Sequence, residues 1–514
     1  MTRSMKNNRT SNGIRNILIV FGSTIFNIIF QFVNRAFFVR LLSTEYLGIN
    51  GLFTDILSVL ALSELGVGSA MMYALYKPVA ENDTEKIKSI MQLYKKLYRG
   101  IGIIILVVGT VLTPFLQYLI KEMPDIPMIR VYYLLYLINS AISYFLVYKK
   151  TLIICNQEEY VTVLVSTSVS VLCKTMQIIF LFLTRNFLVY LLIQICFSFL
   201  ENLINSFIAD KKYNYLKSKD VKPLDKEDVN EIKKNIKAMM THKIGTVVVN
   251  STDSIVMSKL LGLTVLGIYS NYNLIIYNIS SILRKVLWSL NASVGNMVAE
   301  GNKERSEKIF NNILFAAFWV YSFCATAIYT LVQPFITLWV GKNTLFNQIV
   351  VLVLVICFFL EGIRLPALIM RDVTGVFYND RYKPLLEASV NLLTSIPLTI
   401  IFGIIGVKLG TIISYVFVAI WIESYVLYKN YFKKSVFPYL IKLLFYFLLM
   451  ILLCVSTNYI CGLYQGPEIY QLFIRGGICC IFPNLVLFIL FRRKEEFTYL
   501  ANLAKGILHK IKRN

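Results

Sequence analysis

The feature that most constrains this chain is an internal repeat, because a duplicated half decides the architecture before any helix is assigned. When the sequence is shifted by 219 positions, RLLSTEYLGINGLF from Arg40 aligns without a gap with KLLGLTVLGIYSNY from Lys259. At the same offset, VAENDTEK from Val79 aligns with VAEGNKER from Val298. Two patches that match in one register indicate a duplication rather than two unrelated hydrophobic helix pairs with similar flanks.

Composition places both halves in a membrane. The chain of 514 residues is 57% hydrophobic and has a mean hydropathy of +0.63, values that a soluble protein of this size does not show. The formal net charge of +23 does not indicate nucleic-acid binding, because the basic residues lie in short segments between apolar runs. The nine cysteines and two histidines form no metal-binding or disulfide pattern, so we predict no metal and no cofactor.

Fourteen apolar stretches are long enough to cross about 30 Å of hydrocarbon as helices. They lie near residues 14–41, 46–75, 101–120, 130–148, 161–183, 187–209, 240–261, 265–290, 311–332, 347–370, 385–404, 407–428, 439–460 and 471–491. An even number of helices per half makes the two copies enter the membrane in the same direction, as parallel repeats. We therefore predict an all-α polytopic membrane protein with two parallel six-helix bundles and two C-terminal helices.

This arrangement predicts four regions. Residues 1–209 form the first six-helix bundle, and residues 210–240 form a cytoplasmic amphipathic linker. Residues 241–428 form the second six-helix bundle, and residues 429–514 hold helices thirteen and fourteen and a basic cytoplasmic tail. Segments on one side of the predicted membrane, both termini included, carry 38 of the 52 Lys and Arg residues, and the opposite turns carry 7. Because positive charge is retained on the inner side, we predict cytoplasmic termini.

The segments between the helices carry no recognisable catalytic motif. They contain no phosphate-binding GxxxxGK[ST] loop, no GxSxG elbow and no HExxH pair, and the outward turns are too short to hold an active site. We therefore predict a transporter and not an enzyme. A membrane polysaccharide polymerase or ligase, with a catalytic acid among its helices, is the alternative from another class.

Charged residues inside the helices are the candidate site, since charges are costly in hydrocarbon and are kept there for function. The deep basic residues, spread over both halves, are Arg35, Lys174, Arg284, Lys285 and Arg364. They predict a cationic cavity for a diphosphate or another anionic head group, whose lost hydration their N–H donors replace. For Arg364, an internal ion pair with Glu361, three residues earlier, is the other interpretation.

Three acidic residues are candidates for coupling to a Na⁺ or H⁺ gradient. Asp253 lies in the polar run NSTDS and binds an ion in one interpretation. In the other it pairs with Arg35, because the repeat offset places Asp253 on Asn34. Glu64, next to small residues that favour helix packing, and Asp55 are the further candidates.

Three runs carry a family resemblance: EYLGINGLF from Glu45, ELGVGSAMMYALYKPVAENDTEKI from Glu64, and HKIGTVVVNSTDSIVMSKLLGLTVLGIYSNY from His242. They closely resemble the Wzx-type oligosaccharide flippases of the multidrug, oligosaccharidyl-lipid and polysaccharide exporter superfamily. The resemblance implies a MATE-like fold in a bacterial cytoplasmic membrane. In relatives, basic residues of the first and eighth helices line a central cavity, at places that Arg35 and Arg284 match.

The resemblance also implies a cargo and a mechanism. The cargo is an undecaprenyl-diphosphate-linked oligosaccharide, moved to the outer leaflet by alternating access for capsule, exopolysaccharide or O-antigen assembly, with a polysaccharide polymerase as a candidate partner. Within the same fold, a multidrug antiporter for organic cations is the main alternative, although its cavity would be lined by acidic and aromatic residues. A lipid-II-type flippase for the cell wall fits the same physical pattern.

Overall fold

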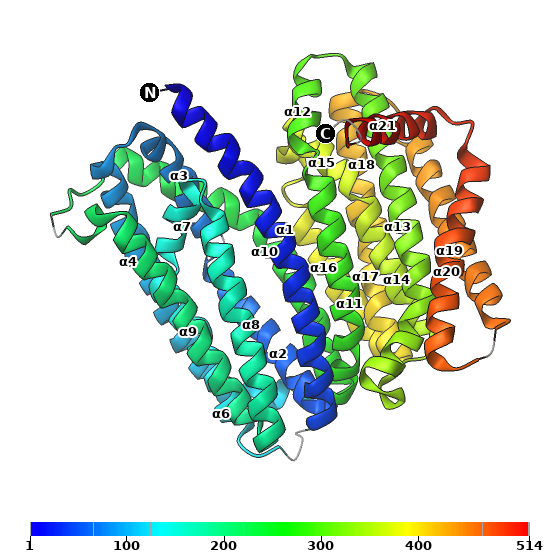
Figure 1. Ribbon diagram of the computed structural model, residues 1–514, viewed down its shortest axis with the longest axis horizontal. Helices are drawn as coiled ribbons and strands as arrows, with labels where there is room; N and C mark the ends of the chain where they lie inside the picture. Colours follow the sequence, from blue (N-terminus) through cyan, green and yellow to red (C-terminus); the bar gives the residue numbers. More distant parts are fainter. Residues whose placement is uncertain (1, 65, 123–125, 219, 465, 512–514) are drawn as a thin grey trace. The chain divides into compact units, whose positions relative to one another are not determined.

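The structure is a computed structural model that describes residues 2–64, 66–122, 126–218, 220–464 and 466–511. Every regular element among these residues is a helix, which confirms the all-α prediction (Figure 1). The chain divides into two compact units, Met1–Gly267 and Ile268–Asn514.

The first unit contains the long helices that follow the N-terminus, with α8 packed beside α1 and α9 beside α8. Its elements are α1 (Thr2–Leu41), α2 (Thr44–Leu60), η1 (Ala61–Glu64), α3 (Val67–Glu81), α4 (Thr84–Leu112), η2 (Thr113–Phe115), α5 (Leu116–Leu119), α6 (Ile129–Leu146), α7 (Tyr148–Cys155), α8 (Glu159–Thr184), α9 (Phe187–Lys212), η3 (Asn214–Lys217), α10 (Lys226–Leu260) and the first turn of α11 (Leu263–Trp288).

The second unit contains the rest of α11 and all later helices. Its elements are α12 (Asn291–Ala299), α13 (Lys303–Val340), η4 (Lys342–Thr344), α14 (Gln348–Ile363), α15 (Leu365–Thr374), η5 (Val376–Asp380), α16 (Lys383–Phe402), α17 (Ile404–Ser414), the π-helical turn η6 (Tyr415–Ile420), α18 (Trp421–Leu427), the π-helical turn η7 (Tyr428–Phe432), α19 (Phe437–Gly462), α20 (Glu468–Phe491) and α21 (Glu495–Ile511).

The local structure repeats at the offset found in the sequence. Helices α1 and α10 end at Leu41 and Leu260, which lie 219 positions apart. Helices α2 and α11 begin at Thr44 and Leu263, at the same offset. Helices α4 and α13 also begin 219 positions apart. The helix boundaries therefore support the duplication independently of the residue identities.

The starts of α4 and α13 show why the boundaries coincide. The side chain of Asp83 accepts a hydrogen bond from the backbone N–H of Lys86 at 2.9 Å. The repeat-related Asn302 accepts one from the N–H of Arg305 at 3.0 Å. Asp and Asn are preferred at this position because their side chains pair a backbone donor that the helix leaves unsatisfied. Both copies thus keep the same cap with different residues.

Eleven helices of the described residues are long and apolar enough to cross a membrane, by length and composition. Three predicted spans, near 46–75, 240–261 and 265–290, are not among them. The second and third are rich in Asn, Ser, Thr and Tyr, which lowers their hydropathy. The multi-pass membrane class is thus confirmed, and the number of fourteen crossings stays a prediction.

The predicted span 46–75 is interrupted in the structure. Helix α2 gives way to the 3₁₀ turn η1, and α3 then begins after Gly66, whose φ of 92° lies in the left-handed region. Glycine has no Cβ and adopts this φ at little cost, so the sequence places the break here. The predicted span 265–290 also ends at a break, because α11 ends at Trp288 and α12 begins at Asn291.

The region predicted as a linker, 210–240, is only partly separate from the next helix. Helix α10 begins at Lys226 and continues without a break to Leu260. Its first turn contacts the start of α4, where Lys86 Nζ lies 2.8 Å from a carboxylate oxygen of Asp228. The hydroxyl of Ser89 also donates to the backbone oxygen of Lys222 at 2.6 Å. The start of α10 and the segment before it are therefore joined to α4 within the first unit.

Aromatic packing attaches the last two membrane helices to the second unit. The ring of Phe318 on α13 stacks on Tyr446 of α19, with ring centroids 3.9 Å apart. Phe315 on α13 contacts Phe491 of α20 at 5.2 Å. Such contacts bury large apolar rings and add geometric preference to the burial. Helices α19 and α20 thus pack on the core of the second unit.

Candidate functional site

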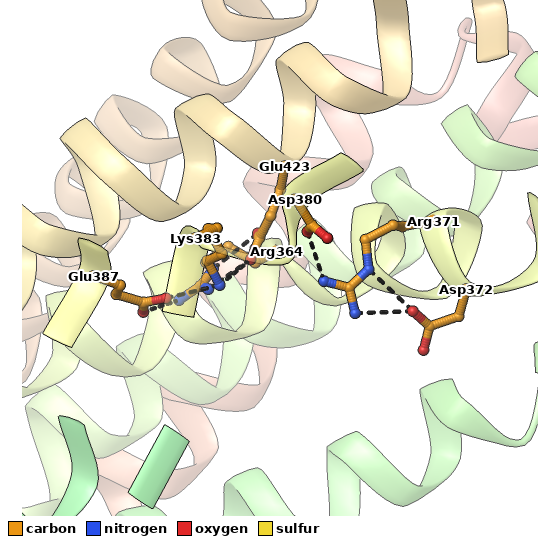
Figure 2. A network of polar contacts seen from close by, with 7 residues as sticks. All are labelled: Arg364, Arg371, Asp372, Asp380, Lys383, Glu387 and Glu423. Atoms are coloured by element: carbon orange, nitrogen blue, oxygen red, sulfur yellow. Dashed lines mark hydrogen bonds and ion pairs between the residues drawn. The ribbon is translucent and has the colours of Figure 1, made fainter. Parts of the chain in front are cut away.

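The most buried charged cluster of the described residues lies in the second unit, around Arg364 (Figure 2). The Arg364 guanidinium donates two hydrogen bonds to Glu423 of α18, from Nε at 3.1 Å and from Nη2 at 2.7 Å. Its Nη1 lies 3.3 Å from Oε1 of Glu387 on α16. This fork geometry is the bidentate pairing that arginine makes with carboxylates.

A second base completes this cluster. Lys383, at the start of α16, places Nζ 2.6 Å from Oε1 of Glu423 and 2.7 Å from Oε2 of Glu387, one helical turn later. The four side chains Arg364, Lys383, Glu387 and Glu423 are each at most 9% exposed. Two positive and two negative charges therefore neutralise one another inside the protein.

The position of Arg364 follows from a helix break. Helix α14 ends at Ile363, and α15 begins at Leu365 with Pro366 in its first turn. Proline lacks a backbone N–H and fits the first turn of a helix but not the interior of one. Arg364 thus lies at the junction, and its guanidinium also covers the ring of Tyr415 at 4.7 Å.

A second ion-pair group adjoins the cluster (Figure 2). The Arg371 guanidinium on α15 donates to Asp380 at 2.8 Å and to Asp372 through Nε at 3.0 Å and Nη2 at 2.8 Å. The Asp380 side chain is 1% exposed. The two groups together connect α15, η5, α16 and α18, and so fix the connection between the tenth and eleventh predicted helices.

Glu361 has a different partner from the one that its spacing suggested. It pairs with Arg284 of α11, whereas Arg364, one residue beyond the end of α14, pairs with Glu423 and Glu387. The Arg284 side chain is 46% exposed and that of Glu361 is 34% exposed. This ion pair therefore remains accessible, whereas the Arg364 cluster is closed. Lys285, next to Arg284, is exposed.

The two basic candidates of the first unit, Arg35 and Lys174, lie on α1 and α8, which pack against each other. Lys174 Nζ lies 3.4 Å from the backbone oxygen of Asn27 and 3.5 Å from its side-chain oxygen. Arg35 is partly exposed on α1, next to Asn34. The Asn34 amide donates to Gln177 at 3.0 Å and to the hydroxyl of Tyr190 at 3.3 Å. A neutral amide thus contacts Lys174, and the residue next to Arg35 contacts an amide and a hydroxyl.

The three acidic candidates are in different surroundings. Glu64 lies in η1, where Oε1 accepts from the hydroxyl of Tyr98 and Oε2 from the hydroxyl of Tyr144, both at 2.8 Å. Asp55 is partly exposed on α2. Asp253 is buried on α10, 7% exposed, among buried serines. The role of these three residues in coupling to an ion gradient stays a prediction.

Several residues of these clusters were not predicted from the sequence. Lys383, Glu387 and Asp380 lie at or near a connecting segment, where charged residues are expected to face water. The Lys383–Glu387 spacing of one helical turn was a usable signal, since such pairs meet on a helix face. Among the described residues no group of three His, Cys, Asp or Glu side chains could hold a metal ion.

A family model described as "Polysaccharide biosynthesis protein" matches residues 14–287, more than half of the sequence. No curated protein matches the sequence. The matched residues include both copies of the first repeat patch, which start at Arg40 and Lys259, and the first copy of the second, which starts at Val79.

Solved transporter structures share the fold. The structure of "Lipid II flippase MurJ, inward closed conformation" matches with a TM-score of 0.63 and 15% identity, covering 93% of this chain and 99% of that one. An inward-facing multidrug resistance MATE family transporter of the MOP superfamily matches with a TM-score of 0.59 and 15% identity, covering 79% and 96%. The Vibrio cholerae MATE transporter VcmN matches with a TM-score of 0.54 and 15% identity, covering 84% and 99%. At these identities the likeness concerns the fold.

Proposed function

Because the chain belongs to the polysaccharide biosynthesis protein family, we propose that it is a flippase for undecaprenyl-diphosphate-linked oligosaccharide repeat units. It moves them from the inner to the outer leaflet of a bacterial cytoplasmic membrane, for capsule, exopolysaccharide or O-antigen assembly. The family match is the observation that carries the proposal. The fold shared with MurJ supports it, since that protein is a lipid II flippase.

The proposed topology has fourteen crossings, with both termini in the cytoplasm, and the two duplicated bundles alternate access to the path between the leaflets. The lipid tail stays in the bilayer while the diphosphate and sugar cross. An inside-negative potential favours outward movement of an anion by roughly 2.3 kcal/mol per charge per 100 mV. A doubly charged head group is therefore driven outward by voltage, and a Na⁺ or H⁺ gradient is a further candidate drive through Asp253, Asp55 or Glu64.

The proposed diphosphate contacts are Arg35, Lys174, Arg284 and Lys285. Arg364 ranks below them because Glu423 and Glu387 already neutralise it and its side chain is 9% exposed. The accessible pair between Arg284 and Glu361 suits a binding role, since an incoming diphosphate competes with the carboxylate for the same donors. Arg364 is better suited to hold the helices that surround it.

The test uses cells whose only copy carries Arg35→Ala or Arg284→Ala. We expect lipid-linked oligosaccharide to accumulate on the cytoplasmic side and surface polysaccharide to fall, with normal protein abundance. The matched control is Arg305→Ala, whose 58% exposed side chain pairs with Glu300 at a helix start. Unchanged surface polysaccharide and unchanged intermediates in both variants would contradict the proposed contacts.

Export of organic cations is the second candidate function, because MATE family transporters share the fold. Loss of the gene would then sensitise cells to cationic drugs without any accumulation of lipid-linked sugar. Elongation of sugar chains by the purified protein in liposomes would instead favour the polymerase alternative.

A further inference from the structure

A close backbone contact joins two segments that the repeat relates. Gly48 lies in the first turn and a half of α2, and Gly267 occupies the equivalent place in α11, at the 219-residue offset. A Cβ atom added to Gly48 would fall on the backbone carbonyl of Leu263, and one added to Gly267 would fall on the carbonyl of Thr44. Both added Cβ atoms would lie well within 3.0 Å of these carbonyl groups, and real Cβ atoms essentially never approach another atom so closely.

The contact is reciprocal. Leu263 is the repeat equivalent of Thr44, so each glycine faces the first residue of the other helix. The glycine of each copy thus contacts the same position in the other copy. This is the pattern of an isologous interface around a two-fold axis. All four residues belong to the unit Met1–Gly267. A chance approach of two helices would not reproduce both contacts at one sequence offset.

Glycine is required on both sides for a physical reason. In place of a Cβ, each glycine directs a Cα–H toward a carbonyl oxygen, and such Cα–H···O contacts are weak individually. Small residues at a membrane helix crossing let the backbones approach closely without any strong bond. The two Cα–H···O contacts of the crossing are therefore tight but individually weak, so they can break and form again as the helices move.

We propose that this crossing, which we call the glycine crossing (Thr44–Gly48 with Leu263–Gly267), is the closure of the transport path on the outward side. The inference rests on the proposed function, because parallel repeats place the path along the axis that relates them and the charge distribution puts these helix starts outside. The glycines are positioning residues: they contact no cargo, and the close approach that they permit completes the outward closure.

The test is hydrogen exchange of the purified full-length protein carrying Gly48→Ala or Gly267→Ala. A methyl group cannot fit the crossing, so the closed arrangement loses stability, as overpacked contacts do. We expect exchange to rise about tenfold at the starts of both α2 and α11 in either variant, because each glycine holds the other helix as well as its own. Exchange in α8 and α13 should not change.

The matched control is Gly51→Ala. Gly51 lies three residues after Gly48 on the same helix, but its added Cβ would meet only the Leu266 side chain, at 3.9 Å. We expect wild-type exchange in this variant. A rise confined to the substituted helix, a uniform rise over all helices, or no rise in either glycine variant would overturn the proposal.

A second measurement asks whether the crossing closes the outward side. A cysteine at Gly51, which has room for a side chain and lies deeper than the crossing, should react faster with a membrane-impermeant maleimide added outside when Gly267→Ala is also present. A cysteine at the exposed Ser43 should react equally in both backgrounds. Equal reaction of the Gly51 cysteine with and without Gly267→Ala would contradict an outward closure.

Neither measurement needs cargo. A negative result in either one can therefore be distinguished from a failure of the proposed function. If cells that lack the protein do not accumulate lipid-linked oligosaccharide, the cargo assignment fails while the exchange result stands. If they accumulate it but both glycine variants exchange as wild type does, the flippase assignment stands and the glycine crossing is not its outward closure.

Discussion

In the first unit the Glu64 carboxylate accepts hydrogen bonds from two tyrosine hydroxyls, whereas in the second unit the Glu423 carboxylate faces a guanidinium and an ammonium group. The two halves repeat their helix boundaries but not this interior chemistry. In the hydrocarbon region a neutral hydroxyl costs less to bury than a cation. A duplicated scaffold can therefore keep its backbone contacts while each copy satisfies its carboxylates in its own way.

Because of this difference, the two units should differ in how well they tolerate a substitution that changes a buried charge. The Arg364 cluster is closed and balanced, so any charge change leaves an uncompensated ion in a buried place. Glu64 instead lies at the break between α2 and α3, with neutral donors from α4 and α6. The second unit is thus the more rigidly specified at its charged core, and the three predictions that follow test this contrast.

The largest effect is expected for Glu423→Gln. This change leaves Arg364 and Lys383 with Glu387 as their remaining described carboxylate partner, and removing one partner of a buried ion pair costs about 3–5 kcal/mol. We expect the purified protein to lose most of its thermal stability in detergent. The double variant Arg364→Met with Glu423→Gln should recover part of the loss, and equal instability of the single and double variants would contradict a charge-based cause.

A smaller effect is expected for Glu64→Gln. The amide has one acceptor oxygen, so either Tyr98 or Tyr144 loses its acceptor, and an unsatisfied buried hydroxyl costs about 1–3 kcal/mol. Thermal unfolding of the same preparation measures the loss. Adding Tyr144→Phe removes the unpaired hydroxyl and should bring the midpoint back toward wild type. A loss as large as that of Glu423→Gln would remove the contrast between the units.

The smallest effect is expected for Lys434→Ala, which separates ion pairing from burial. Lys434 Nζ lies 2.5 Å from Glu307 but outside the membrane-spanning helices, and its side chain is 55% exposed. The hydrogen bond to the Glu307 carboxylate raises the pKa of Lys434 above its usual value. A raised folded-state pKa contributes stability that is complete below the unfolded pKa and lost as the pH rises through the folded one.

Water screens the Lys434–Glu307 ion pair, and exposed pairs of this kind contribute little to stability. We therefore expect an unchanged thermal midpoint for Lys434→Ala at neutral pH. The wild-type advantage, if measurable by thermal unfolding, should disappear only in strongly alkaline buffer. A clear loss at neutral pH would mean that ion pairing itself, rather than burial, distinguishes the second unit.

Sequence alone determined the class of the protein and the register of its repeat. Hydropathy and helix caps depend on residues within a turn or two of each other, and these interactions survive without the tertiary fold. The predicted spans 161–183 and 187–209 therefore agree with α8 and α9. The alignment of the repeat likewise pairs Gly48 with Gly267, without reference to any contact between them.

Only the tertiary structure decided the partners of the charges. The sequence spacing suggested an ion pair between Glu361 and Arg364. In the structure Arg364 pairs with Glu423, 59 residues away, and Glu361 pairs with Arg284, 77 residues away. Which helices pack against each other is set by the fit of many side chains at once, and no single spacing records it. For the same reason, the 219-residue offset related the two glycines, but only packing showed that each rests on the other's helix.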